Sequence, residues 1–203
     1  NLPHPPLEIL LTVEEEMGIV GADNLDPSLL SGKTLINLDS ETEGIFTVGC
    51  AGGGSVTMTL PVTWEAQTED EVILELKVSG LQGGHSGEDI NKHRANSNKL
   101  IARVLDSIQS KLPIRLSALK GGTARNAIPR ETAAVILVPK EKLEACKTIF
   151  GKAADALRGE HIVSEREISI TLNQVNGENI RAVHPDETKG IIEMLIALPH
   201  GVS

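Results

Sequence analysis

The feature that most limits how this chain can fold is a repeated change of apolar periodicity between residues 72 and 172. Apolar side chains alternate with polar ones over 72–78, as in a strand with one partly exposed face. Over 101–112 they recur at spacings of 3, 1, 3 and 4, which predicts one apolar face of a helix. The later segments predict strands at 114–119, 132–138 and 168–172, and a helix at 143–157.

The predicted order is therefore β-α-β-β-α-β. This order is typical of the ferredoxin-like fold, in which two helices pack on one face of a four-stranded antiparallel sheet. We assign it to a separate domain at 54–180, which follows a glycine-rich hinge that ends near Gly53. After Pro185 a last helix is predicted over 187–197, and we expect 181–203 to return to the first domain.

Residues 1–53 indicate part of a second, parallel-sheet domain, which makes the chain α/β overall. An apolar run at 9–13 leads into three acids, and a second run at 35–38 predicts a buried strand that ends at Asp39. A short helix and loop are expected between them, within 18–30. In open α/β sheets ligands bind beyond the carboxyl ends of the strands, which is where these acids would lie.

Charge and cysteine content exclude several classes of function. The chain has 19 basic and 28 acidic residues, a net charge of −9, which argues against nucleic acid or an anionic membrane as a partner. No apolar run approaches the roughly 18 residues of a membrane span. Cys50 and Cys146 match no disulfide framework or CxxC motif, so we expect buried thiols and a cytoplasmic location.

Carboxylates supply the first candidate site. A turn at Gly18 would let the neighbouring acids at 14–16 serve one site, where one carboxylate ligates a metal ion and another takes a proton from water. The alternative is a solvated acidic face at a helix start. Asp39 ends an apolar run and so needs a metal, a partner or water, although it could equally cap the next turn.

Two glycine-rich motifs supply the second candidate site. His85 lies in Gly-Gly-His-Ser-Gly at 83–87, where its imidazole could donate to a carbonyl oxygen or an oxyanion. Arg125 and Asn126 lie in Gly-Gly-Thr-Ala-Arg-Asn-Ala-Ile-Pro at 121–129, where the guanidinium could grip a carboxylate. The alternatives are a turn histidine without a role and a hairpin loop whose arginine faces water.

Five stretches together carry a family resemblance. They are Leu-Thr-Val-Glu-Glu-Glu-Met-Gly at 11–18, Ile-Asn-Leu-Asp-Ser-Glu at 36–41, Gly-Cys-Ala-Gly-Gly at 49–53, and the motifs at 83–87 and 121–129. In this order they resemble the co-catalytic zinc peptidases of the aminoacylase and carnosinase clan, most closely the bacterial aminoacyl-histidine (Xaa-His) dipeptidases. Such enzymes hydrolyse small dipeptides and commonly pair as homodimers through a lid or dimerisation domain, which is the role that the resemblance implies for 54–180.

The resemblance implies a role for each candidate residue, written here in the numbering of this chain. Glu15 would be the general base and Glu16 a zinc ligand, while Asp39 would bind the other of two zinc ions, with manganese or cobalt as alternative metals. His85 would reach the neighbouring subunit's active site and polarise the scissile carbonyl. Arg125 and Asn126 would hold the free carboxylate of the dipeptide.

The chain departs from the family pattern in its metal ligands. The upstream His-x-Asp pair, the bridging Asp and the downstream His of the family are missing, since His4 has no Asp two residues later and His200 is followed only by three residues. We therefore expect the 203-residue chain alone to be inactive and to be part of a longer protein. The alternatives are a non-catalytic dimerisation module, or a sister activity such as an aminoacylase or tripeptidase.

Overall fold

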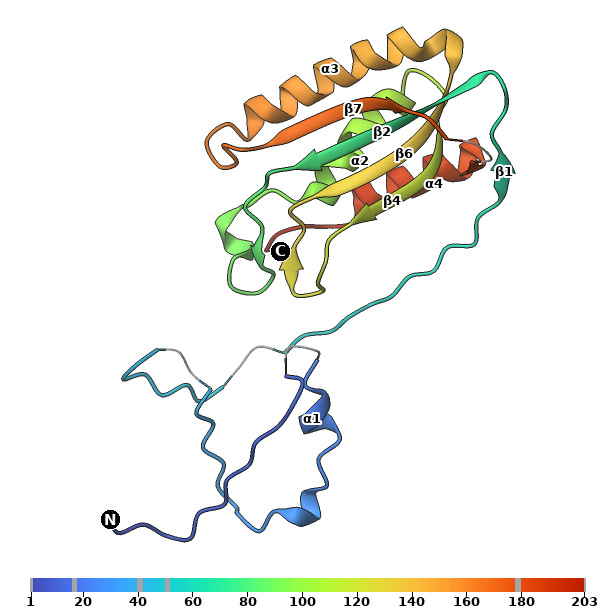
Figure 1. The fold of residues 1–203 in the computed structure, drawn as a ribbon. Coiled ribbons are helices and arrows are strands. Elements are labelled where there is room, and N and C mark those ends of the chain that lie inside the picture. The colour runs from blue at the N-terminus through green and yellow to red at the C-terminus, as the bar shows by residue number, and fades with distance from the viewer. Residues whose placement is uncertain (1, 16–17, 40–41, 50–51, 178–179, 203) are drawn as a thin grey trace. The chain divides into compact units, whose positions relative to one another are not determined.

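The computed structural model describes residues 2–15, 18–39, 42–49, 52–177 and 180–202, and the chain divides into two units, Asn1–Thr57 and Met58–Ser203 (Figure 1). The helices are α1 (Val20–Asp23), α2 (Ser97–Gln109), α3 (Leu143–Glu160) and α4 (Pro185–Ala197), with short 3-10 turns at Pro27–Leu29, Ile90–Lys92 and Lys140–Lys142. The strands are β1 (Trp64–Ala66), β2 (Glu71–Ser79), β3 (Gly84–His85), β4 (Arg115–Gly121), β5 (Ala127–Ile128), β6 (Thr132–Pro139), β7 (Ser169–Val175) and β8 (Arg181–Val183).

The second unit is built on a four-stranded antiparallel sheet with the order β4-β6-β2-β7. Along the chain the elements follow as β2, α2, β4, β6, α3 and β7, and both helices lie on the same face of the sheet (Figure 1). The predicted ferredoxin-like arrangement is therefore confirmed, as is the mixed α/β class.

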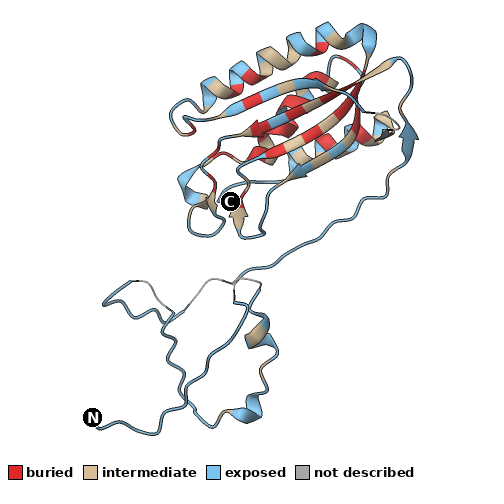
Figure 2. Cartoon of the chain, in the orientation of Figure 1, coloured by how far each residue is buried: buried red, intermediate tan, exposed pale blue. Residues whose placement is uncertain are grey.

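The main core lies between this sheet and the two helices, where Figure 2 shows the buried residues gathered. Leu74, Leu76 and Val78 face it from β2, and Ile101 and Ile108 face it from α2. These residues belong to the periodic runs that predicted the elements, so the alternation in β2 and the helical spacing in α2 describe one shared apolar interior. Aliphatic side chains dominate it, because the chain has only 1% aromatic residues.

The opposite face of the sheet carries a smaller apolar cluster and a buried cation. Ile73 of β2 and Leu137 of β6 pack there with Ala182 of β8. At the same end of the sheet Arg115 is buried, and its guanidinium pairs with Glu71 at 3.0 Å and with Glu65 at 3.3 Å. These ion pairs connect β4 to β2 and to β1. No local sequence pattern predicts this connection.

The C-terminal segment 181–203 was expected to return to the first domain, but it lies in the second unit. β8 pairs antiparallel with β1, and Ile192 of α4 is buried in the main core. The Lys99 ammonium donates to the carbonyl oxygens of Leu195, Ile196 and Leu198 at 2.6–2.8 Å, which fixes the end of α4 against the start of α2. The domain roles given to 1–53 and 54–180 stay predictions.

The first unit contains α1 within the expected 18–30 region, whereas its apolar runs are not strands in the described residues. Leu35 and Leu38 are 82% and 88% exposed, so the predicted burial of the run before Asp39 is wrong for this chain. A buried strand needs neighbours for its backbone N–H and C=O groups and a cover for its side chains. The described residues of this unit supply neither.

None of the helices in the described part of the chain combines the length and the apolar composition needed to cross a bilayer. Of the two cysteines, Cys146 on α3 is completely buried, as expected, and Cys50 lies outside the described residues. Burial raises the pKa of the Cys146 thiol to about 11. The thiol form is therefore favoured by the folded state.

We expect iodoacetamide at pH 8 to alkylate Cys146 at least about 100-fold more slowly in the folded chain than in urea, because both thiolate content and access fall on folding. Mass spectrometry of timed samples measures the rates. Since the folded pKa is the higher one, this group's contribution to stability is complete below the ordinary thiol pKa of roughly 8.5 and is lost as pH rises through 11. Equal rates in both states would contradict the burial of this side chain.

Candidate functional site

The structure brings the two glycine-rich motifs of the second unit together. β3 and β5 form an antiparallel pair in which Gly84 lies opposite Ile128 and His85 opposite Ala127. Beyond this pair the backbone N–H of Ser86 donates to the carbonyl oxygen of Asn126 at 2.8 Å. His85 therefore lies beside the turn that carries Arg125 and Asn126, although the sequence alone did not predict this contact.

The imidazole of His85 is held through one nitrogen and is exposed at the other end. Nδ1 accepts from the backbone N–H groups of Gly87 at 3.2 Å and Glu88 at 3.3 Å. This pattern assigns the proton of the neutral ring to Nε2. Because the His85 side chain is exposed, Nε2–H is available as a hydrogen-bond donor to a ligand.

Asp89 stabilises the turn that follows His85. Its Oδ2 accepts from the backbone N–H of His85 at 2.8 Å and pairs with Arg94 at 3.2 Å. A hydrogen bond from Lys92, then that backbone N–H, and then the charge of Arg94 lower the pKa of the Asp89 carboxyl. Asp89 is therefore an anion at neutral pH and orders the backbone that presents the imidazole.

A side chain at position 84 would collide with this arrangement. Gly84 has φ +142°, and a Cβ atom there would overlap Arg94 and Asp89. Arg94 also donates from Nη1 to the carbonyl oxygen of Gly83 at 2.6 Å. Gly84 is thus required by close packing against an arginine and an aspartate that the motif itself does not contain, whereas a Cβ atom at Gly83 would meet the Arg130 side chain.

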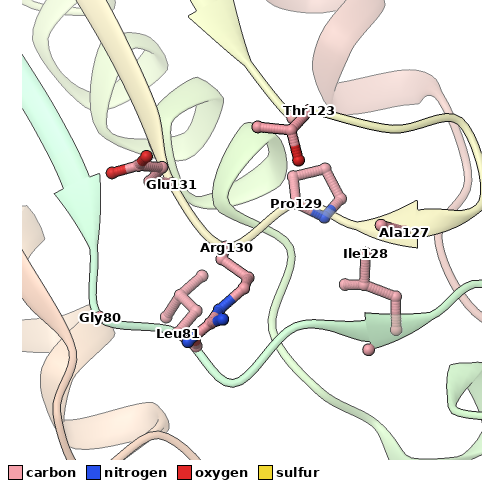
Figure 3. Close-up of a pocket in the computed structure, with 10 residues that line it drawn as sticks. Gly80, Leu81, Thr123, Ala127, Ile128, Pro129, Arg130 and Glu131 are labelled. Atoms are coloured by element: carbon pink, nitrogen blue, oxygen red, sulfur yellow. The ribbon is translucent and has the colours of Figure 1, made fainter.

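Arg125 and Asn126 are both exposed on their turn, as a ligand-binding role requires. Neither side chain makes a hydrogen bond to another described residue. A cavity of about 440 Å³ opens beside the same turn, lined among others by Leu81, Thr123 and Ile128 (Figure 3). Arg130, which also lines it, points toward Leu81 and donates from Nε to that residue's carbonyl oxygen at 3.1 Å.

Glu165 is a buried acid that contacts the chain on both sides of the His85 motif, and the sequence did not predict its role. Its side chain is 1% exposed, and its carboxylate accepts from the backbone N–H groups of Gln82 at 2.8 Å and Ala95 at 2.9 Å. Nothing in its surroundings, Val-Ser-Glu-Arg-Glu at 163–167, distinguishes it from a solvated charge. Only the three-dimensional contact to a distant loop marks it.

The acids of the first unit form a separate set. Glu15 and Asp39 have exposed side chains, and Glu16 lies outside the described residues. The turn expected at Gly18 is present, since the carbonyl oxygen of Glu15 accepts from the N–H of Gly18 at 3.0 Å. The N–H of Asp39 donates to the Asn37 side chain at 2.7 Å, and no hydrogen bond or ion pair joins the Asp39 carboxylate to another residue that the structure describes.

A catalytic zinc site generally uses three protein ligands. Within the ranges that the structure describes, no three His, Cys, Asp or Glu side chains are grouped so that they could hold a metal ion. The described part of the chain therefore does not form such a site by itself, and the ligand roles of Glu16 and Asp39 stay predictions.

Comparison with known proteins identifies the relatives of this chain. Residues 76–165 match the family model described as the peptidase dimerisation domain. The whole chain is 38% identical over 202 residues to the cytosol non-specific dipeptidase of Escherichia coli (strain K12), and it spans 41% of that protein.

The crystal structure of aminoacylhistidine dipeptidase from Vibrio alginolyticus matches 95% of the chain with a TM-score of 0.73 and 32% identity. The chain covers 39% of that structure. The resemblance expected from the five motifs is confirmed by these matches.

Proposed function

We propose that this chain, which carries a peptidase dimerisation domain and is related along its whole length to dipeptidases, is part of a metal-dependent dipeptidase that cleaves Xaa-His dipeptides. The observation that carries the proposal is the β3–β5 pair, which sets a donor imidazole beside an exposed arginine and asparagine. An oxyanion donor and a carboxylate clamp are the two groups that a dipeptide needs from a lid domain.

In this proposal His85 stabilises the oxyanion that forms on the scissile carbonyl. Its Nε2–H faces outward because Nδ1 is occupied by two backbone N–H groups. A donor that is already oriented loses little free energy through reorganisation when charge develops. Since the matched domain is a dimerisation domain, we include a homodimer in the proposal, with His85 serving the partner subunit's site.

Arg125 and Asn126 would bind the free carboxylate at the C-terminal end of the dipeptide. A guanidinium forms two parallel hydrogen bonds with a carboxylate, and a carboxamide NH₂ adds a third donor. Both side chains lie on the turn next to His85, so one substrate could contact all three. This contact would select short peptides with a free C-terminus over internal peptide bonds.

The metal-binding part of the proposal rests on acids of the first unit, together with the family ligands that residues 1–203 do not include. Glu16 and Asp39 would each bind one of two zinc ions, with manganese or cobalt as alternatives. Bound metal of this kind lowers the pKa of a coordinated water toward neutrality. Glu15 would take the proton of that water and pass it to the leaving amine.

One alternative is that this chain acts only as a dimerisation module. The match at 76–165 and the absence of a three-ligand cluster among the described residues both favour it for the chain alone. A sister aminoacylase or tripeptidase activity of the full-length protein is the other alternative, and relative rates on different substrates distinguish it. A cytoplasmic location is part of the proposal and is supported by the cytosolic relative.

The test is cleavage by the full-length, metal-loaded protein of a dipeptide Xaa-His, which releases histidine, and of the same dipeptide with an amidated C-terminus, which releases histidinamide. We expect cleavage of the free acid, at least about 100-fold lower kcat/KM for the amide because Arg125 loses its partner, and loss of activity in a chelator that added zinc restores. Faster cleavage of acylated amino acids or tripeptides would favour a sister enzyme. Activity that survives complete metal removal would overturn the proposal.

A further inference from the structure

We propose that Glu165 is a positioning residue that fixes the His85 loop, defined here as residues 82–95, and so sets the direction of the His85 imidazole. This inference rests on the role of His85 in the proposed function. It concerns a buried acid outside the two glycine-rich motifs, on the turn that follows α3.

Glu165 holds both ends of the His85 loop at once. One carboxylate oxygen accepts from the N–H of Gln82, the first residue of the loop, and the other from the N–H of Ala95, the last. Each oxygen is used for one end, at 2.8 and 2.9 Å. The loop is therefore closed at its base by a single side chain that comes from a different part of the sequence.

The chemical nature of Glu165 is informative. A carboxylate at 1% exposure is unfavourable unless hydrogen bonds compensate it, and no Lys, Arg or His in the described ranges forms an ion pair with it. An apolar side chain would fill the same space without the desolvation cost of a buried charge. What a carboxylate adds is two acceptors aimed at two N–H groups, which a neutral glutamine cannot match because its NH₂ group faces one of them.

A series of contacts connects the end of the loop at Ala95 to His85. Arg94, next to Ala95, donates to the Gly83 carbonyl and pairs with Asp89, and Asp89 accepts from the His85 N–H. Every step is a hydrogen bond or ion pair of 2.6–3.2 Å. A shift of either loop end would therefore move the N–H groups of 87 and 88 that orient the imidazole.

Glu71 provides a matched control for a role in stability alone. It too is a largely buried carboxylate, paired with Arg115 at 3.0 Å, but it lies at the opposite end of β2 from the His85 loop, about 26 Å away along a strand of 9 residues. Glu71→Gln makes the same chemical change as Glu165→Gln without touching the loop.

The experiment compares Glu165→Gln with Glu71→Gln in two preparations. In the 203-residue chain, hydrogen exchange followed by NMR is expected to show the Gly87 and Glu88 amides exchanging about 10-fold faster in Glu165→Gln only, with core amides of β2 unchanged. In the full-length protein, kcat is expected to fall about 10- to 100-fold with KM within about twofold, and Glu71→Gln is expected to keep kcat.

A double variant separates positioning from general stability. If Glu165 acts through His85, adding Glu165→Gln to His85→Ala lowers kcat no further than His85→Ala alone. Additive losses, or unchanged exchange at residues 87 and 88, would overturn the proposal. If Glu165→Gln fails to fold, Glu165→Asp replaces it, since a shorter carboxylate keeps the charge but cannot reach both N–H groups, and the same readouts apply.

The two proposals fail in different ways. Normal turnover in His85→Ala would remove His85 from the proposed mechanism, whereas the amide exchange in the 203-residue chain would still report whether Glu165 fixes the loop.

Discussion

Replacing His85 with alanine in the full-length protein is expected to lower kcat by about 10²- to 10³-fold, with KM nearly unchanged. The reason is that an oriented Nε2–H donor acts on the charge that develops in the transition state and contributes little to binding the neutral carbonyl. Steady-state kinetics on an Xaa-His dipeptide gives both constants. Metal analysis of the purified variant is expected to match the wild type, because His85 lies within residues 76–165, which match the peptidase dimerisation domain, and is not one of the predicted metal ligands.

His93→Ala is the matched control for His85→Ala. His93 belongs to the same loop and is exposed, and among the described residues its side chain makes no hydrogen bond. Its backbone has φ 53°, and alanine keeps the same Cβ, so the substitution adds no new backbone strain. Equal losses in both variants would indicate general damage to the loop, and normal turnover in His85→Ala would exclude an oxyanion role.

Glu15→Gln in the full-length protein is expected to lower kcat by about 10²- to 10⁴-fold, the range for a lost general base. The carboxamide has nearly the same shape but cannot accept the proton from water. Bound metal is expected to stay at the wild-type level, because the resemblance assigns the ligand role to Glu16. Rates and metal content are measured on the same preparation.

Glu14→Gln is the comparison for this variant, since Glu14 precedes Glu15 in the chain and has no assigned role. We expect its kcat to stay within a few-fold of wild type. A larger loss in Glu14→Gln than in Glu15→Gln would reverse the assignment, and loss of metal in Glu15→Gln would make Glu15 a ligand.

The sheet and helices of the second unit were predictable because their apolar residues repeat over many positions. The ends of the elements were harder to predict, because local capping interactions determine where a helix begins. α2 begins at Ser97, ahead of its first predicted apolar position, because the Asn96 side chain accepts from the N–H of Asn98 at 2.9 Å. The helix thus starts at a polar cap that the apolar pattern does not include.

The candidate site was predictable in its residues but not in its geometry. His85, Arg125 and Asn126 stand out by their glycine-rich surroundings, yet their proximity depends on the pairing of β3 with β5, and strand pairing between distant segments leaves no local pattern. Glu165 and Arg115 were missed for a related reason. Their burial is created by tertiary contacts: the sequence neighbours of Glu165 are ordinary for a surface residue, and the apolar neighbours of Arg115 predict a strand but not the carboxylates that pair with its guanidinium.

The exposed apolar runs of the first unit have a practical consequence for handling the chain. Ile9, Leu11 and Phe46 are 86%, 88% and 95% exposed, and neighbouring apolar residues extend each run. Extended, β-prone stretches in water associate with copies of themselves or with chaperones. Purification of this chain by itself therefore calls for dilute solutions and for light-scattering checks before any binding measurement is interpreted.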